Sequence, residues 1–489
     1  AYPYAADRFY VNDADTTDDE YTTAPGSNRN TGKLADRPKP YPNNVLRIYT
    51  LGANQTLLTD TGSYALFDPT VVSETAGIGD DEGFVWTGPT GEGRTAELWH
   101  ANPLTVASLI ELNDADLVTI RHLTLDNELR GLWVHNGSSR FTGEYLSVSG
   151  HSEDGILIEG SIAQDTEFTQ LHYIVAQDNG RHGIYVDSPI DAVTDSLVGG
   201  NAQRGIYLTN QEGLLLADNV VHDNGSDGIY YKGAQGQQTT ISGNTVHGNE
   251  RGIYVTTTTN DSAVTITGNE VFDNRDNGIE AIRHVLVSLN SVYDNAESGI
   301  HVTTGGEAVE NVVFGNAVGI QLGGWYNSAT ARRNRVYDNA LAGIEAHYAS
   351  LAEGNVVYSN LRGVVGLGSF QGIIANNLVY INTNEAILLD KAGDPELFGN
   401  TIYQQSGAGV RIENNSSGVN LRNNIIRVDA GYGISVANDS QSGFQSDFNL
   451  LLATGTGNVG LWQDADRRDL AAWRNAAFTD QSSIDQDPL

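Results

Sequence analysis

Five side chains that can exchange protons or bind charged groups occur over three neighbouring segments of the sequence. They are His135, Glu159, Arg181, Tyr185 and Asp187. An imidazole accepts a proton near neutral pH, a phenol or a carboxylic acid can donate one, and a guanidinium pairs with carboxylates. These residues form a candidate catalytic cluster if the fold brings the three segments together.

A longer series of aromatic and charged residues surrounds this cluster and continues beyond it. Flat rings beside carboxylates, imidazoles and a lysine suit a linear polysaccharide, because rings stack on sugar faces while polar groups bind hydroxyls or carboxylates. The alternative is that tyrosine favours strands and stacks on its cross-strand neighbours without any ligand. The candidate substrate-binding residues are Trp133, Tyr207, Tyr230, Lys232, Tyr254, Glu280, His301, Glu345 and His347.

The elements that must position these side chains follow from a repeat. From about residue 219 the chain repeats an asparagine, a small or polar residue, an apolar residue, an aromatic, one more residue and a second asparagine. A few residues and Gly-Ile-x-Val follow, and the period is 21 to 25 residues. The repeat is rich in β-branched residues and lacks the regular leucines and helical stretch of a leucine-rich repeat. The sequence predicts an all-β fold, a single-stranded right-handed parallel β-helix, or solenoid, of roughly a dozen or more coils.

Two columns of the repeat have a structural interpretation. Asparagine tolerates the left-handed conformations of tight corners, and stacked amides can hydrogen-bond from coil to coil. Ring stacking accounts for the aromatic column without a ligand, and for its two histidines without a metal. The aromatic column is His222, His247, Phe272, Tyr293, Phe314, Tyr337, Tyr358, Tyr380 and Tyr403.

The Gly-Ile-x-Val-x′ strand places the candidate residues on one surface. Ile and Val point inward, so x and x′ point outward, and equivalent positions of successive coils lie about 4.8 Å apart. His135, Glu159, Asp187, Lys232 and His347 fall at x′. The residues at x are Glu111, Trp133, Leu157, Tyr185, Tyr207, Tyr230, Tyr254, Glu280, His301, Gln321, Glu345, Val365, Leu388, Arg411 and Ser435.

The ends of the chain depart from the repeat, as the terminal repeats of a solenoid do when they cover an exposed core. We expect an N-terminal cap and first strands over residues 1–100, regular coils over 101–445 and a C-terminal capping segment over 446–489. The run DRRDLAAWRNAAF (466–478) has helical spacing and predicts a short helix in the last segment.

Composition limits the partners. There are 61 acidic and 27 basic residues, and the net charge of −34 argues against binding nucleic acid or an anionic membrane through a basic surface. No apolar run is long enough to span a bilayer. Zero cysteines exclude disulfides, and an acidic chain that begins at Ala1 without methionine suggests a processed segment of a secreted or cell-surface protein, monomeric or cut from a larger chain.

Three motifs resemble those of bacterial mannuronan C-5 epimerases and related uronate lyases. They are GLWVHN (131–136), DGILIE (154–159) and RHGIYV (181–186) in consecutive coils. The resemblance implies that His135 removes the C5 proton of a uronate, that Arg181 or a bound cation neutralises its carboxylate and that Tyr185 donates a proton. Trp133 stands where those epimerases have an acid, and Arg130 where they have a tyrosine.

These observations predict a protein that acts on an acidic, uronate-containing polysaccharide such as alginate or pectin, as a lyase or C-5 epimerase. The alternative is a non-catalytic carbohydrate-binding or adhesive solenoid. Glu280 and Glu345 lie three coils apart, about 14 Å, which is too far for a glycosidase pair. Ca²⁺ is the candidate cofactor, because the loops DTTDDE (15–20) and GDDEG (79–83) are rich in acids, although such runs are also common in solvated loops.

Overall fold

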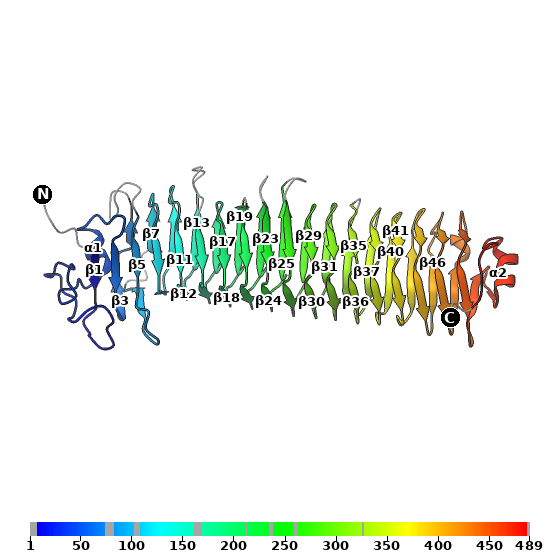
Figure 1. Cartoon of the computed structure of the whole chain (residues 1–489), viewed down its shortest axis with the longest axis horizontal. Coiled ribbons are helices and arrows are strands. Elements are labelled where there is room, and N and C mark those ends of the chain that lie inside the picture. Colours follow the sequence, from blue (N-terminus) through cyan, green and yellow to red (C-terminus); the bar gives the residue numbers. More distant parts are fainter. Residues whose placement is uncertain are drawn as a thin grey trace. The chain divides into compact units, whose positions relative to one another are not determined.

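The computed structural model describes residues 7–73, 83–101, 108–160, 169–211, 213–233, 238–258, 263–324 and 327–486. The chain forms two compact units, Ala1–Asn249 and Glu250–Leu489. In both units each coil contributes three short strands, and each strand pairs in parallel with the equivalent strand of the next coil (Figure 1). The predicted fold class is confirmed: the chain is an all-β solenoid of about 15 turns with three parallel sheets and almost no helix.

One sheet is built from the Gly-Ile-x-Val segments and is called the GIxV sheet here. Its strands in the first unit are β4 (Thr70–Val72), β7 (Ser108–Asn113), β10 (Arg130–His135), β13 (Ile156–Glu159), β16 (Ile184–Asp187), β19 (Ile206–Gln211) and β22 (Ile229–Gly233). Each of them pairs in parallel with the next strand in this order.

The second unit continues the same pattern within its own boundaries. Its GIxV strands are β25 (Ile253–Thr257), β28 (Ile279–Ile282), β31 (Ser298–Thr303), β34 (Val318–Leu322), β37 (Ala342–His347), β40 (Arg362–Leu367), β43 (Glu385–Asp390), β46 (Ala408–Glu413), β49 (Tyr432–Val436) and β52 (Asn458–Trp462). The short strand β53 (Ala465–Arg467) pairs antiparallel with β52 and ends the sheet.

The core of each coil is made by the inward positions of these strands. Ile184 and Val186 of β16 are fully buried, whereas Tyr185 and Asp187 between and after them are partly exposed. The same alternation recurs in β25 and β28. Burial of the β-branched positions against the equivalent residues above and below fixes which face of each strand points outward.

Buried asparagines join the coils along the axis. In the second unit Asn295 donates its backbone N–H and its Nδ2 to Oδ1 of Asn316, both at 3.0 Å, and its own Oδ1 accepts the same two bonds from Asn274. Both Asn columns form such ladders, which continue to Asn449 in one column and to Gln404 in the other. The predicted axial bonding of the asparagines is confirmed.

The predicted backbone conformation of these asparagines is wrong. The left-handed residue at each corner is the one before the ladder asparagine, for example Asp223 (φ 53°) before Asn224 and Asp294 (φ 54°) before Asn295. Asn, Asp and Gly take most of these corner positions, because their side chains are small or bond locally and the left-handed region costs them less. The ladder asparagine itself keeps its side chain for the neighbouring coil.

The aromatic column stacks as predicted. In the second unit six rings lie 4.9 to 5.0 Å apart and within 10° of parallel. They come from β27 (Glu270–Phe272), β30 (Ser291–Tyr293), β33 (Val312–Phe314), β36 (Arg335–Tyr337), β39 (Val356–Tyr358) and β42 (Leu378–Tyr380). In the first unit His222 stacks on His247 at 5.5 Å.

Each end of the chain carries a short helix. In the first unit α1 (Pro42–Leu46) starts with Pro42 and buries Val45 and Leu46. In the second unit α2 (Leu470–Ala477) confirms the helix predicted over 466–478; Asp469 caps its first turn by accepting from the Ala472 N–H at 2.8 Å, and Trp473 is fully buried. The boundaries at residues 100 and 445 stay a prediction. Among the described residues, neither helix is long and apolar enough to cross a bilayer.

We predict that Asn295→Ala destabilises the second unit by about 2–4 kcal/mol, because several buried backbone and amide groups lose their partners at once. Amide hydrogen exchange checks this: the N–H of residue 274, which donates to Asn295 Oδ1, should lose protection. The exposed amide Gln371, substituted by Ala, is the control in the same unit. Equal protection of residue 274 in both variants would show that the ladder does not hold the coils.

Candidate functional site

The predicted columns are in register in both units, but Leu157, Val365 and Leu388 at x are buried rather than exposed. In the first unit Trp133 is in register with Glu111 and Leu157, and Leu157 with Tyr185, which pairs with Tyr207 and then Tyr230. In the second unit the x column runs in register from Tyr254 to Ser435. The five candidate catalytic residues therefore lie on or beside three adjacent strands, β10, β13 and β16.

His135 lies beneath Trp133 and is bonded to the preceding coil. Its Nε2 donates to Oε1 of Glu111 at 2.9 Å, and the Trp133 ring stacks on the imidazole at 3.7 Å between centroids. Only 7% of the residue is exposed. An imidazole held by a carboxylate has the orientation of a general base, but here it is largely covered.

The two acids of the predicted cluster lie side by side on adjacent strands. Glu159 is in register with Asp187. Oε1 of Glu159 accepts from Trp133 Nε1 at 3.0 Å, whereas Oδ1 of Asp187 accepts from the hydroxyl of Thr209 and from Asn210 Nδ2. Hydrogen bonds to the charged forms stabilise two carboxylates that would otherwise repel each other.

Arg181 is fixed by a buried carboxylate. Its Nε and Nη2 both bond to Asp154, which is completely buried and also accepts the backbone N–H of His182. The hydrogen bond to Asp154 raises the pKa of Arg181 above its ordinary value. This bidentate pair holds the guanidinium at the corner that leads into β16, with about a third of its side chain exposed.

His182 has a structural role, because it bonds to the backbone of the next coil and packs against two tyrosines. Its Nδ1 accepts the backbone N–H of Arg204 at 3.2 Å, and its ring packs against Tyr185 and Tyr207. Burial, and then the charges of Arg181 and Arg204, lower the pKa of His182 to about 3. The ring is therefore neutral at pH 7.

A charged residue that the sequence analysis did not single out, Arg204, lies beside the aromatic strip, the name used here for Tyr185, Tyr207 and Tyr230 on adjacent strands. The guanidinium carbon of Arg204 is 4.5 Å from the ring centroids of both Tyr207 and Tyr230, and its Nε donates to Oδ2 of the buried Asp227 at 2.8 Å. Arg130 over Trp133 and Arg181 over Tyr185 repeat the arrangement. The sequence already contained this pattern: an arginine stands directly before Gly-Leu (Arg130) or Gly-Ile (Arg204), or one position earlier (Arg181).

The rings of Tyr185, Tyr207 and Tyr230 pack on one another from coil to coil. Tyr185 stacks on Tyr207 at 4.6 Å and 15°, and Tyr207 meets Tyr230 edge-on at 5.0 Å. The cross-strand stacking considered as the alternative is therefore present. Burial, and then Asp187, raise the pKa of Tyr185, so its phenol is protonated at neutral pH. Contact with carbohydrate stays a prediction for these residues.

The candidate residues of the second unit form two separate groups. Glu280 accepts from Arg251 at 2.9 Å, with His301 Nδ1 3.9 Å away, and Arg251 lies over the Tyr254 ring. His347 Nε2 bonds to Glu345 at 2.9 Å on the same strand. The register confirms that Glu280 and Glu345 are three strands apart. Their roles stay a prediction.

The acidic loop at residues 15–20 is bonded to the N-terminal cap. Asp15 accepts from the backbone of Thr16 and Thr17, Asp19 accepts from Asn12 at 2.7 Å, and Glu20 accepts from the backbone of Gly91 at 2.8 Å. Across the ranges that the structure describes, no group of three or more His, Asp or Glu side chains is placed to hold a metal ion. Residues 79–82 of the other acidic loop lie outside those ranges. Calcium stays a prediction.

Two protein-family models match parts of the chain. Residues 323–470 match the family described as a right handed beta helix region, which agrees with the fold. Residues 158–345 match the family described as a periplasmic copper-binding protein (NosD). No curated protein matches the chain.

Several solved structures are similar to the chain at low identity. The A-module of a mannuronan C-5 epimerase from Azotobacter vinelandii is 15% identical, with 88% of this chain and 91% of that chain covered and a TM-score of 0.30. A pectate lyase is 12% identical, with 80% and 79% covered and a TM-score of 0.28. A surface adhesin of Streptococcus pneumoniae is 10% identical, with 84% of both chains covered and a TM-score of 0.23. Similarity at this level carries no argument about activity.

The residues do not fit a copper centre. Copper in proteins favours thiolate, thioether and imidazole ligands. The chain has no cysteine and no methionine, and the metal-ligand groups of three or more that such a centre needs are absent from the described residues. In the matched region His172 and His182 are engaged by hydrogen bonds of the fold.

We predict that acid weakens the first unit through His182. The unfolded chain binds a proton near pH 6.5 and the folded chain near pH 3, so the stabilisation is complete above the unfolded pKa and is lost as the pH falls. Between pH 7 and pH 5 the loss amounts to about 2 kcal/mol. Urea denaturation at each pH checks this, with His182→Asn expected to reduce the pH dependence. Part of it remains, because burial also lowers the pKa of His151, in the same unit, to about 4. An unchanged slope in that variant would contradict the assignment.

Proposed function

We propose that the outer face of the GIxV sheet in the first unit binds an acidic polysaccharide and recognises its uronate carboxylates. This surface is called the polyuronate face. The observation that carries this proposal is the state of Arg204. Its Nε is used by Asp227, while its two Nη groups bond to none of the described residues. The guanidinium lies over the rings of both Tyr207 and Tyr230, and these contacts together with the bond to Asp227 preorganise its free edge for a carboxylate.

Other hydrogen-bond donors lie near Arg204 on the same face. Lys232, one of four lysines in the chain, is exposed at x′ of the next strand and is unpaired among the described residues. Arg181 adds a partly exposed guanidinium one coil before Arg204, and the hydroxyl of Tyr185 is protonated. Because the ring faces are occupied by neighbours, recognition on this face depends on hydrogen bonds and charge rather than on sugar stacking.

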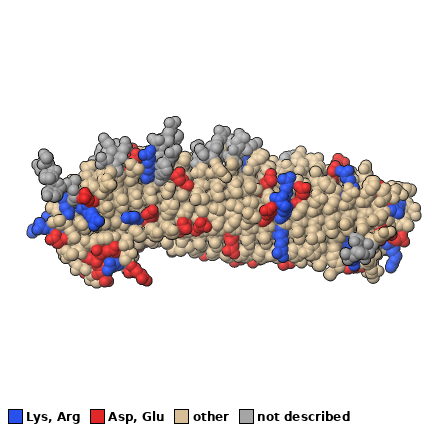
Figure 2. All heavy atoms as spheres, viewed as in Figure 1, with Lys and Arg blue, Asp and Glu red and all other residues tan. Residues whose placement is uncertain are grey.

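The position of the buried acids is compatible with a polyanion on this face. Asp154 and Asp227 are buried, and each pairs with an arginine, so they fix guanidiniums rather than repel a polyanion from the surface. The rest of the molecule is acidic, and Figure 2 shows acidic side chains spread over the face in view. A polyanion would therefore be attracted only where such donors gather.

Binding is better supported than turnover because the two proton-transfer candidates turn away from each other. His135 bonds to Glu111 in the preceding coil, whereas Tyr185 packs on Tyr207 in the following coil. Their strands are two steps apart, about 9.6 Å. To move protons to and from one carbon of the substrate, each of the two groups must lie within hydrogen-bond reach of that carbon, about 3 Å.

Lyase or C-5 epimerase activity is the second candidate. Two observations favour it: His135 is oriented by Glu111 as general bases are, and the raised pKa of Tyr185 keeps the phenol in the proton-donating form. Turnover on this face requires Trp133 to move off the imidazole.

We predict that the double variant Arg204→Gln/Asp227→Asn binds polyuronates at least tenfold more weakly. The pair is neutralised together so that no buried charge is left without its partner, and the loss reflects a charge-assisted hydrogen bond, about 1.5–3 kcal/mol. Calorimetric titration of the full chain with oligomers of mannuronate, guluronate and galacturonate measures it.

The control is Arg332→Gln/Glu353→Gln, which removes an exposed ion pair between adjacent coils of the second unit and changes the charges in the same way. Arg332, the last residue of β35 (Thr330–Arg332), lies within ion-pair distance of Glu307 as well as Glu353. Affinity that falls equally in both double variants would point to a general charge effect. An absence of binding to any of the oligomers would refute the proposal.

Turnover has its own test. The full chain is incubated with polymannuronate, alginate and polygalacturonate, while absorbance near 230 nm reports new double bonds and proton NMR reports inverted residues. If the second candidate is right, His135→Ala and Tyr185→Phe each reduce the rate by about 10²-fold or more. Binding without either product excludes it and leaves the binding proposal intact.

A further inference from the structure

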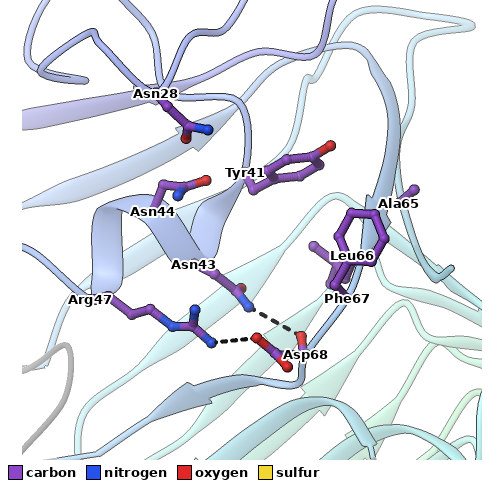
Figure 3. Close-up of a pocket in the computed structure, with 9 residues that line it drawn as sticks. All are labelled: Asn28, Tyr41, Asn43, Asn44, Arg47, Ala65, Leu66, Phe67 and Asp68. Carbon is purple, nitrogen blue, oxygen red and sulfur yellow. Dashed lines mark hydrogen bonds and ion pairs between the residues drawn. The ribbon is translucent and has the colours of Figure 1, made fainter. Parts of the chain in front are cut away.

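A cavity of about 290 Å³ lies at the N-terminal cap of the first unit, outside the face discussed above (Figure 3). Its walls are α1 on one side and, on the other, the end of β3 (Gly62–Leu66) with the turn that leads to β4. Asn43 fastens these walls together, because its Nδ2 donates to the carbonyls of Asp68 and Pro69 at 3.1 and 3.2 Å and its Oδ1 accepts from Thr70. The cavity is therefore part of the folded cap.

Several polar groups that line this cavity have no partner among the described residues. The side chain of Asn44 makes no hydrogen bond, and its Oδ1 is shielded from solvent. The hydroxyl of Tyr41 and the amide of Asn28 are likewise unbonded within that part of the chain. The groups that a ligand could reach are Asn44 Nδ2, the Tyr41 hydroxyl and the Asn28 amide, which are not shielded and are open to a partner in the cavity.

An aromatic ring completes the cavity. Phe67 lines it with 67% of its surface exposed, and in Figure 3 its ring lies across the cavity from α1. An exposed phenylalanine costs hydration free energy that a covering ligand would recover. The ring thus offers an apolar surface opposite the unbonded amides.

The charge of the cavity points to a neutral ligand. Its two ionic groups, Arg47 and Asp68, pair with each other at 2.9 Å. The remaining polar groups are amides and a phenol, which both donate and accept hydrogen bonds, as hydroxyl groups require. The volume is near the lower end of ligand pockets, about 300–1,000 Å³, so the ligand is a molecule of one or two rings.

We propose that this cavity binds a neutral sugar unit, with Phe67 against the apolar face of the ring and Asn28, Tyr41 and Asn44 on its hydroxyls. The proposal does not rest on the polyuronate face, which differs in location and in charge. It gives the N-terminal cap a binding role of its own.

Saturation-transfer NMR and calorimetry on the full chain test the proposal with the methyl glycosides of glucose, galactose and mannose, and with galacturonate as the charged comparison. We expect one or more neutral glycosides to bind and both Phe67→Ala and Asn44→Ala to weaken that binding at least tenfold. Phe448→Ala removes a comparably exposed phenylalanine from the second unit and should change nothing.

Three outcomes would overturn the proposal: no neutral glycoside binds, Phe67→Ala binds as well as the unaltered chain, or only the charged galacturonate binds. Arg204→Gln/Asp227→Asn separates the two sites. Neutral glycoside binding that survives in this variant while polyuronate binding is lost assigns the two ligands to different places. Neutral glycoside binding that disappears with it places that ligand on the polyuronate face and refutes the cavity.

Discussion

The axial hydrogen bond between stacked asparagines is the interaction on which the rest of the structure depends. A single coil buries few groups, and only repetition lets the amide of one coil satisfy the backbone and amide of the next, as Asn274, Asn295 and Asn316 do. This bond sets both the spacing and the register of the coils. Every outward column, including the candidate site, inherits that register.

The corners then decide where charge lies. Arg181 and Arg204 stand at the corners that lead into β16 and β19, where each bonds to an acid of the neighbouring coil. Buried Asp154 and Asp227 hold these guanidiniums. The molecule is acidic overall, yet it carries guanidinium groups at its surface whose partner carboxylates are buried. A polyanion that approaches these corners therefore contacts the guanidinium groups before the carboxylates that pair with them.

Stacking limits what aromatic side chains can do in this fold. Rings one coil apart are close enough to cover each other, as the six-ring column of the second unit and the Tyr185–Tyr207 pair show. A ring whose faces are covered by its neighbours has little face left for sugar stacking. The exposed Phe67 differs because it lies in a turn of the cap, outside any column.

The sequence by itself determined the solenoid, the columns and the ladder, because a period of 21 to 25 residues with alternating Ile and Val can bury its apolar face only by stacking. It identified Trp133, His135 and Tyr185 as neighbours for the same reason. Only the tertiary structure decided which way side chains lean: His135 toward Glu111, Tyr185 toward Tyr207, and Arg204 over the rings of Tyr207 and Tyr230. It alone revealed the cavity at Asn44, because the cap has no repeat, and its contacts join residues whose spacing follows no period.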